Sequence, residues 1–430
     1  MESLLHYVWK HKLYETSELI TADNLRVEVI DPGLANANAG PDFFNAKLRI
    51  GDTLWAGNVE IHDKASDWFR HRHDEDPAYD SIILHVVGSS DAIICRGNGD
   101  RIPQMQMNVP KQLRLNIDWL LSRDRTMPCM QHLAEIAPVK LTSWMNALLS
   151  ERLERKTRDV WRVLQQHGND WNATFYIILS RAFGFGLNND AFEQLASCLP
   201  WIYILKHRGS LFQIEALLFG QAGMLAYCDP DANDYYHRLR QEYIFLQQKL
   251  SLKPMGESKF KFMRIRPTNS PHRKLAQLAA IWYEHDVLFS RIMKENKVEN
   301  LANIFRIEPS EYWQSHYHFH DKSSRALYPS MGDSGLSTIV INAVVPLMFA
   351  FGRNNRKEEY CERAMLFLET LPAENNRIVD TFRASGLCAH NAGDSQALIQ
   401  LRNEYCTKRN CLKCRIAFHL LKKKAEPKLQ

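Results

Sequence analysis

Several features are missing from this 430-residue chain, and each absence excludes a class of protein. No stretch of 18 apolar residues occurs, and the longest apolar segment, residues 339–351, contains Asn342 and Pro346, which argues against a membrane span. The first residues lack the basic, apolar and small-residue order of a signal peptide, so we expect a cytoplasmic protein with no membrane partner. Nine cysteines are too few for a disulfide scaffold. P-loop, dinucleotide-binding and Gly-x-Ser-x-Gly motifs are also absent.

The composition is that of a globular protein, but its positive charge is unevenly placed. Hydrophobic residues make up 45% of the chain and charged residues 24%, with a net charge of +5. Residues 401–430 carry nine Lys or Arg and two Glu, and residues 251–275 carry seven Lys or Arg and one Glu. These segments indicate polyanion contacts, or a solvated tail and loop. We expect four basic residues of the second segment either to contact phosphates or to belong to a capped surface helix. They are Arg264, Arg266, Arg273 and Lys274.

Hydrophobic periodicity divides the chain near residue 138. Before that point it predicts a helix over residues 1–20, strands at 25–30, 43–50 and 53–62, a short helix or loop at 63–79, and strands at 81–87 and 91–97. Beyond it, helical periods cover 140–167, 171–183, 189–198, 211–227, 235–250, 271–295, 335–351, 357–370 and 393–421. The predicted fold class is therefore α+β, with an α+β domain at 1–138 and a mostly helical region at 139–430.

Two acidic residues lie at the ends of adjacent predicted strands. Asp42 opens one strand in GPDF, and Glu60 lies near the end of the next in VEIH, where His62 follows it. Paired carboxylates can hold Mg²⁺ or Mn²⁺ with open positions for water and phosphate, and the metal activates that water. His62 is a candidate water-orienting group, general base or ligand, and Lys64 is a second candidate basic group. Alternatively, GPD is an ordinary turn and Glu60 and His62 are solvated.

A regular hairpin, however, places these two acids out of phase. With Gly51-Asp52 as the turn, Ile50 pairs with Thr53 and the apolar residues of both strands share one face. Extending this register sets Asp42 opposite Ile61, so that Glu60 points to the other face. Irregular pairing at the strand's edge, or a β-bulge near Gly57, would bring the carboxylates together.

The layout of residues 1–100 resembles the core of the PD-(D/E)XK nucleases, which has an acid at one strand start and Glu-x-Lys on the next strand. Here His62 stands where that family usually has Lys. The resemblance implies a metal-dependent nuclease acting on nucleic acid, with Asp42 and Glu60 as metal ligands and His62 and Lys64 assisting. We expect DNA as the partner, although the sequence does not separate DNA from RNA. The departure at His62 also motivates an alternative, a catalytically inactive nucleic-acid-binding or scaffold protein.

The whole chain also resembles an uncharacterised bacterial family of unknown function. The segments that carry this resemblance include GPDFFNAKLRI, GNVEIH, INAVVPLMFAFG and the terminal CLKC. The resemblance implies no activity, so the function has to be inferred from the residues of the site.

Four histidines fall within 24 residues, at His62, His71, His73 and His85. Their spacing matches no standard zinc pattern, so we expect a surface helix with scattered histidines. The alternative is a metallohydrolase that is not a nuclease and holds zinc among these histidines.

Four cysteines gather near the C-terminus, at Cys388, Cys406, Cys411 and Cys414. A Cys-x2-Cys pair with two further thiolates predicts a structural metal in a reducing compartment. Zn²⁺ and an iron–sulfur cluster both suit four thiolates, and some PD-(D/E)XK nucleases carry such a cluster in a cysteine-rich C-terminal region. Alternatively, Cys406, Cys411 and Cys414 are simply small half-buried residues on a helix.

Overall fold

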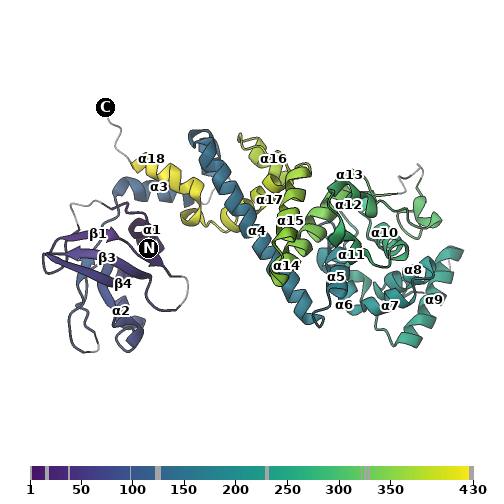
Figure 1. Cartoon of the computed structure of the whole chain (residues 1–430), viewed down its shortest axis with the longest axis horizontal. Helices are drawn as coiled ribbons and strands as arrows, with labels where there is room; N and C mark the ends of the chain where they lie inside the picture. The colour runs from purple at the N-terminus through teal and green to yellow at the C-terminus, as the bar shows by residue number, and fades with distance from the viewer. Residues whose placement is uncertain are drawn as a thin grey trace. The chain divides into compact units, whose positions relative to one another are not determined.

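The computed structural model describes residues 2–14, 19–36, 39–96, 98–121, 127–227, 232–320, 322–323, 327 and 330–425. The chain divides into two compact units, which are unit 1, Met1–Trp144 with Asn403–Gln430, and unit 2, Met145–Arg402. The α+β class is confirmed, because unit 1 contains a mixed sheet and unit 2 is mostly helical (Figure 1). The segment from Asn403 onward, which periodicity groups with the helical region, clusters with unit 1.

Unit 1 is built on a six-stranded sheet in the order β1-β3-β4-β5-β6, with β2 paired to β3. The first strands form an antiparallel meander, whereas β4, β5 and β6 run parallel to one another. Helix α1 precedes the sheet and the short helix α2 connects β4 to β5. The bounds are α1 Glu2–Lys10, β1 Val27–Asp31, β2 Leu34–Ala35, β3 Phe43–Ile50, β4 Thr53–Lys64, α2 Asp67–Arg70, β5 Ile82–Ser89 and β6 Gln104–Gln106.

The predicted strand at 91–97 is wrong. Its described residues, 91–96, form a loop in which only Cys95 makes an isolated bridge, to Arg101. Ile94 is buried in a cluster with Trp68, so the apolar pattern there reflects burial rather than strand pairing. The sheet continues instead at β6.

A β-bulge in β3 brings Asp42 and Glu60, which a regular hairpin would place on opposite faces, into register with each other. Ala46 pairs with Gly57 as the regular hairpin requires, but Phe43, rather than Phe44, pairs with Val59. The extra residue is accommodated at Asn45, which has a left-handed φ of 55°, a conformation that Asn tolerates better than most residues. The shift sets Asp42 beside Glu60 instead of Ile61. The bulge therefore lies in the strand opposite Gly57, where the sequence had suggested it.

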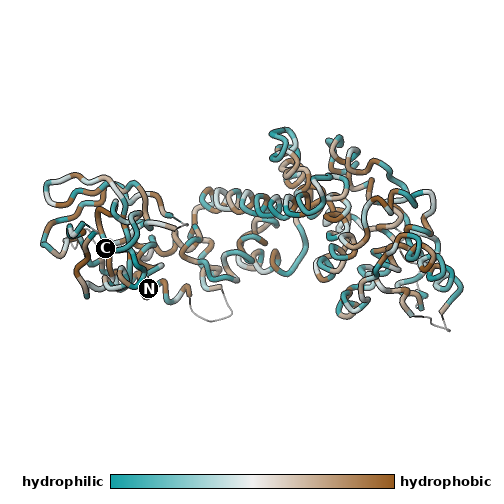
Figure 2. The backbone as a smooth tube through the Cα atoms, turned by 90° about the horizontal axis from the view of Figure 1, so that it is seen from below, coloured by the Kyte–Doolittle hydropathy of each residue, from teal (hydrophilic) through white to brown (hydrophobic). Residues whose placement is uncertain are grey.

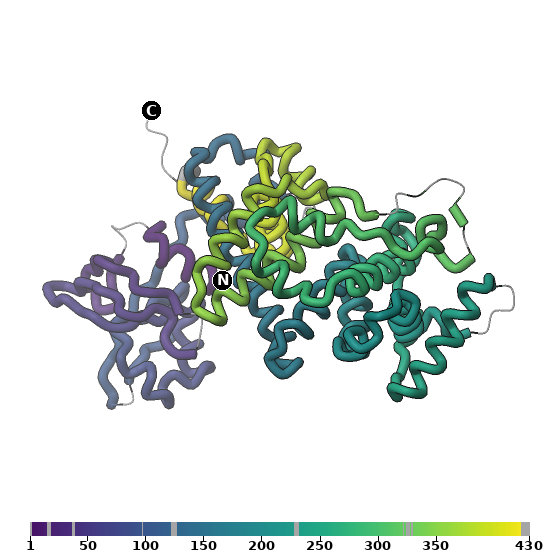
Figure 3. Tube along the Cα trace, turned by 45° about the vertical axis from the view of Figure 1, so that its right-hand side comes forward, coloured from purple at the N-terminus to yellow at the C-terminus, as the bar shows by residue number. Residues whose placement is uncertain are grey.

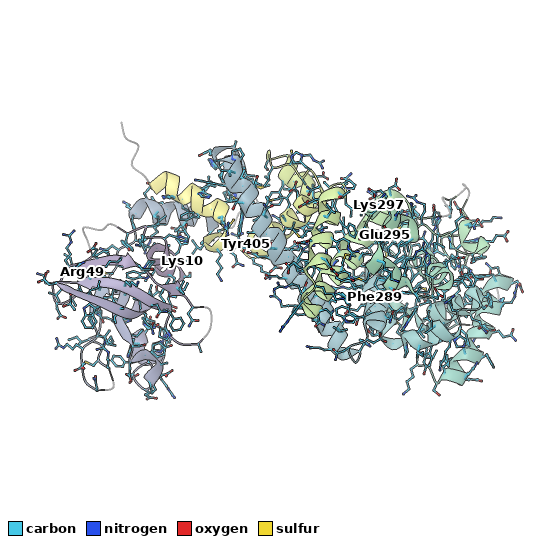
Figure 4. All side chains as sticks on the ribbon, in the orientation of Figure 1. Lys10, Arg49, Phe289, Glu295, Lys297 and Tyr405 are labelled. Atoms are coloured by element: carbon cyan, nitrogen blue, oxygen red, sulfur yellow. The ribbon has the colours of Figure 1, made fainter. Side chains whose placement is uncertain are left out.

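Helices cover the sheet and bring the C-terminal segment into unit 1. Helices α1 and α2 both pack against β4, and α18 (Arg415–Ala425) lies beside α3 (Lys111–Leu121), as Figures 1 and 3 show. The 3-10 helices η3 (Pro128–Glu135) and η9 (Cys411–Lys413) also contact α18. Tyr405, labelled in Figure 4, meets the ring of Trp144 edge to face at 5.3 Å between centroids.

Unit 2 is a helical assembly around an aromatic core that includes Phe175, Tyr176 and Trp282. The long helix α4 begins in unit 1 and continues into unit 2 with mostly hydrophilic residues (Figure 2). Its helices, with the π-helical segments η7 and η8, are α4 Pro138–Gln166, α5 Trp171–Phe183, α6 Asn189–Cys198, α7 Trp201–Lys206, α8 Leu211–Gln221, α9 Asp234–Leu250, α10 Pro271–Glu284, α11 Leu288–Lys294, α12 Val298–Ile304, α13 Asp333–Ile339, η7 Val340–Val344, α14 Val345–Asn355, α15 Glu358–Thr370, α16 Arg377–Arg383, α17 Ala392–Gln400 and η8 Leu401–Cys406.

In the part of the chain that the structure describes, one helix, Asp333–Asn355, is long and apolar enough to cross a membrane by length and composition. Buried residues make up 67% of its most apolar window, which is typical of the core helix of a soluble protein. Pro346 lies within it at the start of α14.

Candidate metal centre

Three segments of unit 1 bring the histidines together. Strand β4 supplies His62, and the parallel strand β5 supplies His85 in the register that pairs it with Glu60. His71 ends α2. The next residue, Arg72, has a left-handed φ of 59° and turns the chain, so that His73 lies back against α2. The His73 amide donates to the Trp68 carbonyl at 3.1 Å. The expectation of scattered histidines on a surface helix is therefore wrong.

The ring nitrogens of these histidines and one Glu60 oxygen lie within a few ångströms of one another. His62 Nε2 lies 3.2 Å from His71 Nδ1 and 3.6 Å from Glu60 Oε1. His73 Nε2 lies 3.3 Å from the same Glu60 oxygen. Ligand atoms of His62, His71 and His73 all lie within 4.8 Å of one another. On its other side, His62 Nδ1 lies 2.8 Å from His85 Nε2.

Burial determines the protonation of this cluster. Glu60 is 4% exposed, and burial, together with the charge of Asp42, raises the pKa of its carboxyl to about 9. Burial, reinforced by the neighbouring imidazoles, lowers the pKa of His62 to about 2. Burial also lowers the pKa of His85, to about 4, and the pKa of His73. The imidazoles of His62, His73 and His85 are thus neutral at pH 7, the state that binds metals, whereas the Glu60 carboxyl keeps its proton.

Asp42 and Glu60 are locked together through the backbone. The Asp42 amide donates to Glu60 Oε2 at 3.0 Å, and Asp42 Oδ2 accepts from the Ile61 amide at 3.0 Å. His6 of α1 reaches the same Asp42 oxygen at 3.1 Å. Burial opposes a charge on His6, but the hydrogen bond and charge of Asp42 outweigh it, so the pKa of His6 is raised. The bulge therefore produces the pairing of acids on which the nuclease resemblance depends.

The donor set fits a transition metal. Ligands about 2.0–2.1 Å from a tetrahedral zinc ion are roughly 3.3 Å apart. The distances of 3.2 Å from His62 to His71, 3.6 Å from His62 to Glu60 and 3.3 Å from His73 to Glu60 are close to this spacing. Imidazole nitrogen suits Zn²⁺ and other transition ions better than Mg²⁺, which prefers oxygen ligands. The His85 ring would orient His62 from behind, because the tautomer that frees Nε2 for a metal donates Nδ1–H to His85 Nε2.

Lys64 lies outside this cluster. It is exposed, and its charge acts on Asp91, lowering the pKa of that carboxyl after the larger effect of hydrogen bonds from Ser66. Among described residues, no hydrogen bond or ion pair joins its ammonium to Asp42 or Glu60. His6, which the sequence did not single out, occupies a basic position beside Asp42 instead.

The predicted cysteine ligands divide between the units. Cys388 is exposed and belongs to unit 2, whereas Cys406, Cys411 and Cys414 belong to unit 1. A cysteine that the sequence did not single out, Cys129, is close to two of them, because burial and then the thiols of Cys414 and Cys411 raise its pKa to about 12. Within the described part of the chain, no cysteine belongs to a set of three ligand atoms as close as the histidines. The cysteine-bound metal stays a prediction.

Sequence comparison places the chain in a family. The model of the family described as "Protein of unknown function (DUF2851)" matches residues 2–377. The chain belongs to this family. The predicted membership in a family of unknown function is thus confirmed. Searches of curated proteins and of solved structures found no match to this chain.

The DUF2851 match includes every residue of the histidine cluster and both acids, but ends before the terminal CLKC segment. Membership in DUF2851 brings no activity with it. The function therefore has to be inferred from the chemistry of the unit 1 site.

Proposed function

We propose that unit 1 is a metal-dependent nuclease that hydrolyses phosphodiester bonds of nucleic acid. The observation that carries the proposal is the convergence of Asp42 and Glu60 through the bulge, next to neutral histidines. The meander of β1, β3 and β4, the helix α2 and the parallel strand β5 follow the element order of the PD-(D/E)XK core, which supports the proposal. DNA is the expected substrate.

The residues of the site would have distinct roles in hydrolysis. Glu60 and the imidazoles of His62, His71 and His73 would hold the metal ion, and Zn²⁺ or Mn²⁺ suits them better than Mg²⁺. Such an ion lowers the pKa of bound water and stabilises negative charge on phosphate oxygens. Asp42 fixes the position of Glu60 through the backbone and holds His6. Trp68, 1% exposed, packs edge-on against His62 and keeps water from that side.

His6 is the candidate for the basic group that the family usually supplies as Lys. Its side chain is 31% exposed, while its buried Nε2 lies 3.1 Å from Asp42 Oδ2, and the nearness of that carboxylate favours the protonated ring. A protonated imidazole beside the metal can stabilise the pentacovalent phosphate or protonate the departing oxygen. Loss of the Lys at position 62 would then be compensated from helix α1.

Cleavage of supercoiled plasmid and of labelled single-stranded DNA tests the proposal, with Mn²⁺, Zn²⁺ and Mg²⁺ supplied in parallel. We expect Glu60→Gln, Asp42→Asn and His6→Gln to lower the cleavage rate by roughly tenfold to a hundredfold or more. Glu28→Gln is the matched control, because Glu28 is an exposed acid of β1 that pairs with Arg49 at 3.2 Å, and Arg49 points into solvent (Figure 4). Cleavage by no metal form, or equal cleavage by all variants, would contradict the nuclease assignment.

The convergence of the histidines favours a second candidate, a zinc hydrolase whose substrate is not nucleic acid. Three histidines with a further open position are typical of catalytic zinc sites. Under this alternative, Asp42→Asn leaves activity on small esters unchanged, whereas His73→Asn abolishes both zinc binding and activity. The nuclease proposal predicts loss in both variants.

A further inference from the structure

The C-terminal segment of unit 1 turns back twice and brings the backbones of three cysteines close together. The π-helical segment η8 ends at Cys406, and the amide of Asn410 then donates to the Tyr405 carbonyl at 2.8 Å, which closes a tight turn. A second turn follows at once, because the Cys414 amide donates to the Cys411 carbonyl at 3.0 Å. A Cys-x2-Cys pair closed in this way can present both of its sulfurs to one metal ion.

A fourth cysteine comes from a distant part of the same unit. Cys129 lies in η3, which packs against both α3 and α18. The Cys411 thiol donates to the Leu120 carbonyl of α3 at 3.9 Å, so the C-terminal turns rest on the same helix. Burial, and then the thiols of Cys414 and Cys411, raise the pKa of Cys129, as expected for neighbouring sulfurs. Cys388, by contrast, is exposed and belongs to unit 2.

Hydrogen-bond donors surround the Cys414 sulfur. Cys414 is 8% exposed, and burial raises the pKa of its thiol to about 11. The amides of Ile416 and Ala417 in the first turn of α18, and the indole N–H of Trp144, favour the thiolate and so oppose that rise in pKa. Trp144 is 4% exposed, and its Nε1 makes no full hydrogen bond within the described part of the chain. A neutral thiol is a weak acceptor, so these donors are better satisfied by a thiolate.

We propose that one structural Zn²⁺ ion is bound in unit 1 by four thiolates, those of Cys129, Cys406, Cys411 and Cys414. Sulfurs about 2.3 Å from a tetrahedral zinc ion lie roughly 3.8 Å apart. Among the described residues, no three sulfurs are as close as the ligand atoms of the histidine cluster, so zinc binding draws them together by side-chain rotation within the two turns. The ion ties η3 to the C-terminal segment and so fastens that segment to unit 1.

Metal binding by the full chain tests this proposal, in a His73→Asn background that removes a ligand of the histidine cluster. The protein is stripped of metal with a chelator under reducing conditions and titrated with Zn²⁺ and, separately, with Co²⁺. We expect one Zn²⁺ per chain and, with Co²⁺, the near-ultraviolet charge-transfer absorption that thiolate ligands produce. Cys129→Ser should lose both signals, whereas Cys388→Ser, the matched control, should keep both.

Two further variants separate ligand loss from misfolding. Cys129→His should bind Zn²⁺ again, because zinc accepts imidazole nitrogen, and this binding excludes unfolding as the cause of the loss in Cys129→Ser. Trp144→Phe keeps a buried ring but removes the N–H, and should weaken Zn²⁺ binding roughly tenfold. The proposal is overturned if Cys129→Ser keeps the metal and the sulfur absorption, if Cys388→Ser loses them equally, or if the purified protein has the brown colour of an iron–sulfur cluster.

Discussion

The protonation of Glu60 predicts how many protons a metal ion displaces on binding. The carboxyl has its pKa raised to about 9 by burial and by Asp42, whereas His62 and His73 have lowered pKa values. Between pH 7 and 8.5 a metal therefore meets neutral imidazoles and a protonated carboxyl. Binding should release one proton from Glu60 and none from these two histidines.

The magnitude follows from the distance between the working pH and that pKa. At pH 7 the carboxyl lies about two units below its pKa, so its deprotonation weakens metal affinity roughly a hundredfold. Affinity should strengthen about tenfold for each unit of rising pH and level off near pH 9. Metal affinity rises with pH because the raised pKa keeps the Glu60 carboxyl neutral until the pH exceeds its pKa in the folded protein.

Titration calorimetry with Zn²⁺ in two buffers of different ionisation enthalpy counts the protons directly. Glu60→Gln keeps an oxygen at the same position without a titrating proton, so it should release one proton fewer than the unaltered chain and lose the pH dependence. The comparison cancels protons from cysteine thiols, which both proteins share. An equal proton count in the two proteins would refute the reasoning.

Three further predictions address the fold around the site. Asn45→Val should destabilise unit 1 by about 1–2 kcal/mol and reduce metal affinity, because a β-branched residue resists the left-handed conformation of the bulge. Asn45→Gly should retain both the stability and the metal affinity. Chemical denaturation and metal titration measure the two quantities. Trp68→Ala should cost about 3–5 kcal/mol in unfolding free energy, measured by denaturation of the metal-free protein, because the ring is 1% exposed. Cys411→Ser with Cys414→Ser should remove one metal per chain in elemental analysis while zinc bound to the histidines remains, and unchanged metal content would eliminate the predicted cysteine site.

Alternation along the chain was sufficient to predict the hairpin. Apolar residues at every second position give β3 its observed bounds, and the Gly51-Asp52 turn fixes the pairing of Ile50 with Thr53. Burial of one face leaves no other register for those residues. Alternation alone predicts a regular register, and only the mismatch in phase between Asp42 and Glu60 suggested a bulge near Gly57, without fixing the residue at which it occurs. Asn45, a residue that tolerates positive φ, was the available signal.

The histidine cluster depends on contacts between segments that sequence spacing does not encode. His62 and His85 meet because β4 and β5 are parallel neighbours, and His71 and His73 reach them because α2 is short and ends in a tight turn. His6 comes from α1, before any strand. Periodicity predicts each element separately, but the distances among these rings are set by sheet order and helix length.

Sequence spacing also fails to locate the helix boundaries beyond residue 138. The predicted helix at 271–295 is two helices, α10 and α11, because the chain leaves helical geometry at His285. The predicted helix at 393–421 contains π-helical and 3-10 segments before α18. Apolar spacing continues across these breaks, since both sides face a core, and so it cannot locate them.

The interrupted sequence of unit 1 has a consequence for synthesis on the ribosome. Strands β1 to β6 emerge early, but α18, which packs on α3, emerges only after all of unit 2. Helix α3 must therefore wait without its partner α18 while the inserted helical unit is translated and folds. Nascent chains stalled within unit 2 should expose the apolar surface of α3 to chaperones. Rapid folding of unit 2, which brings α18 back to α3, would shorten the time for which that surface is exposed.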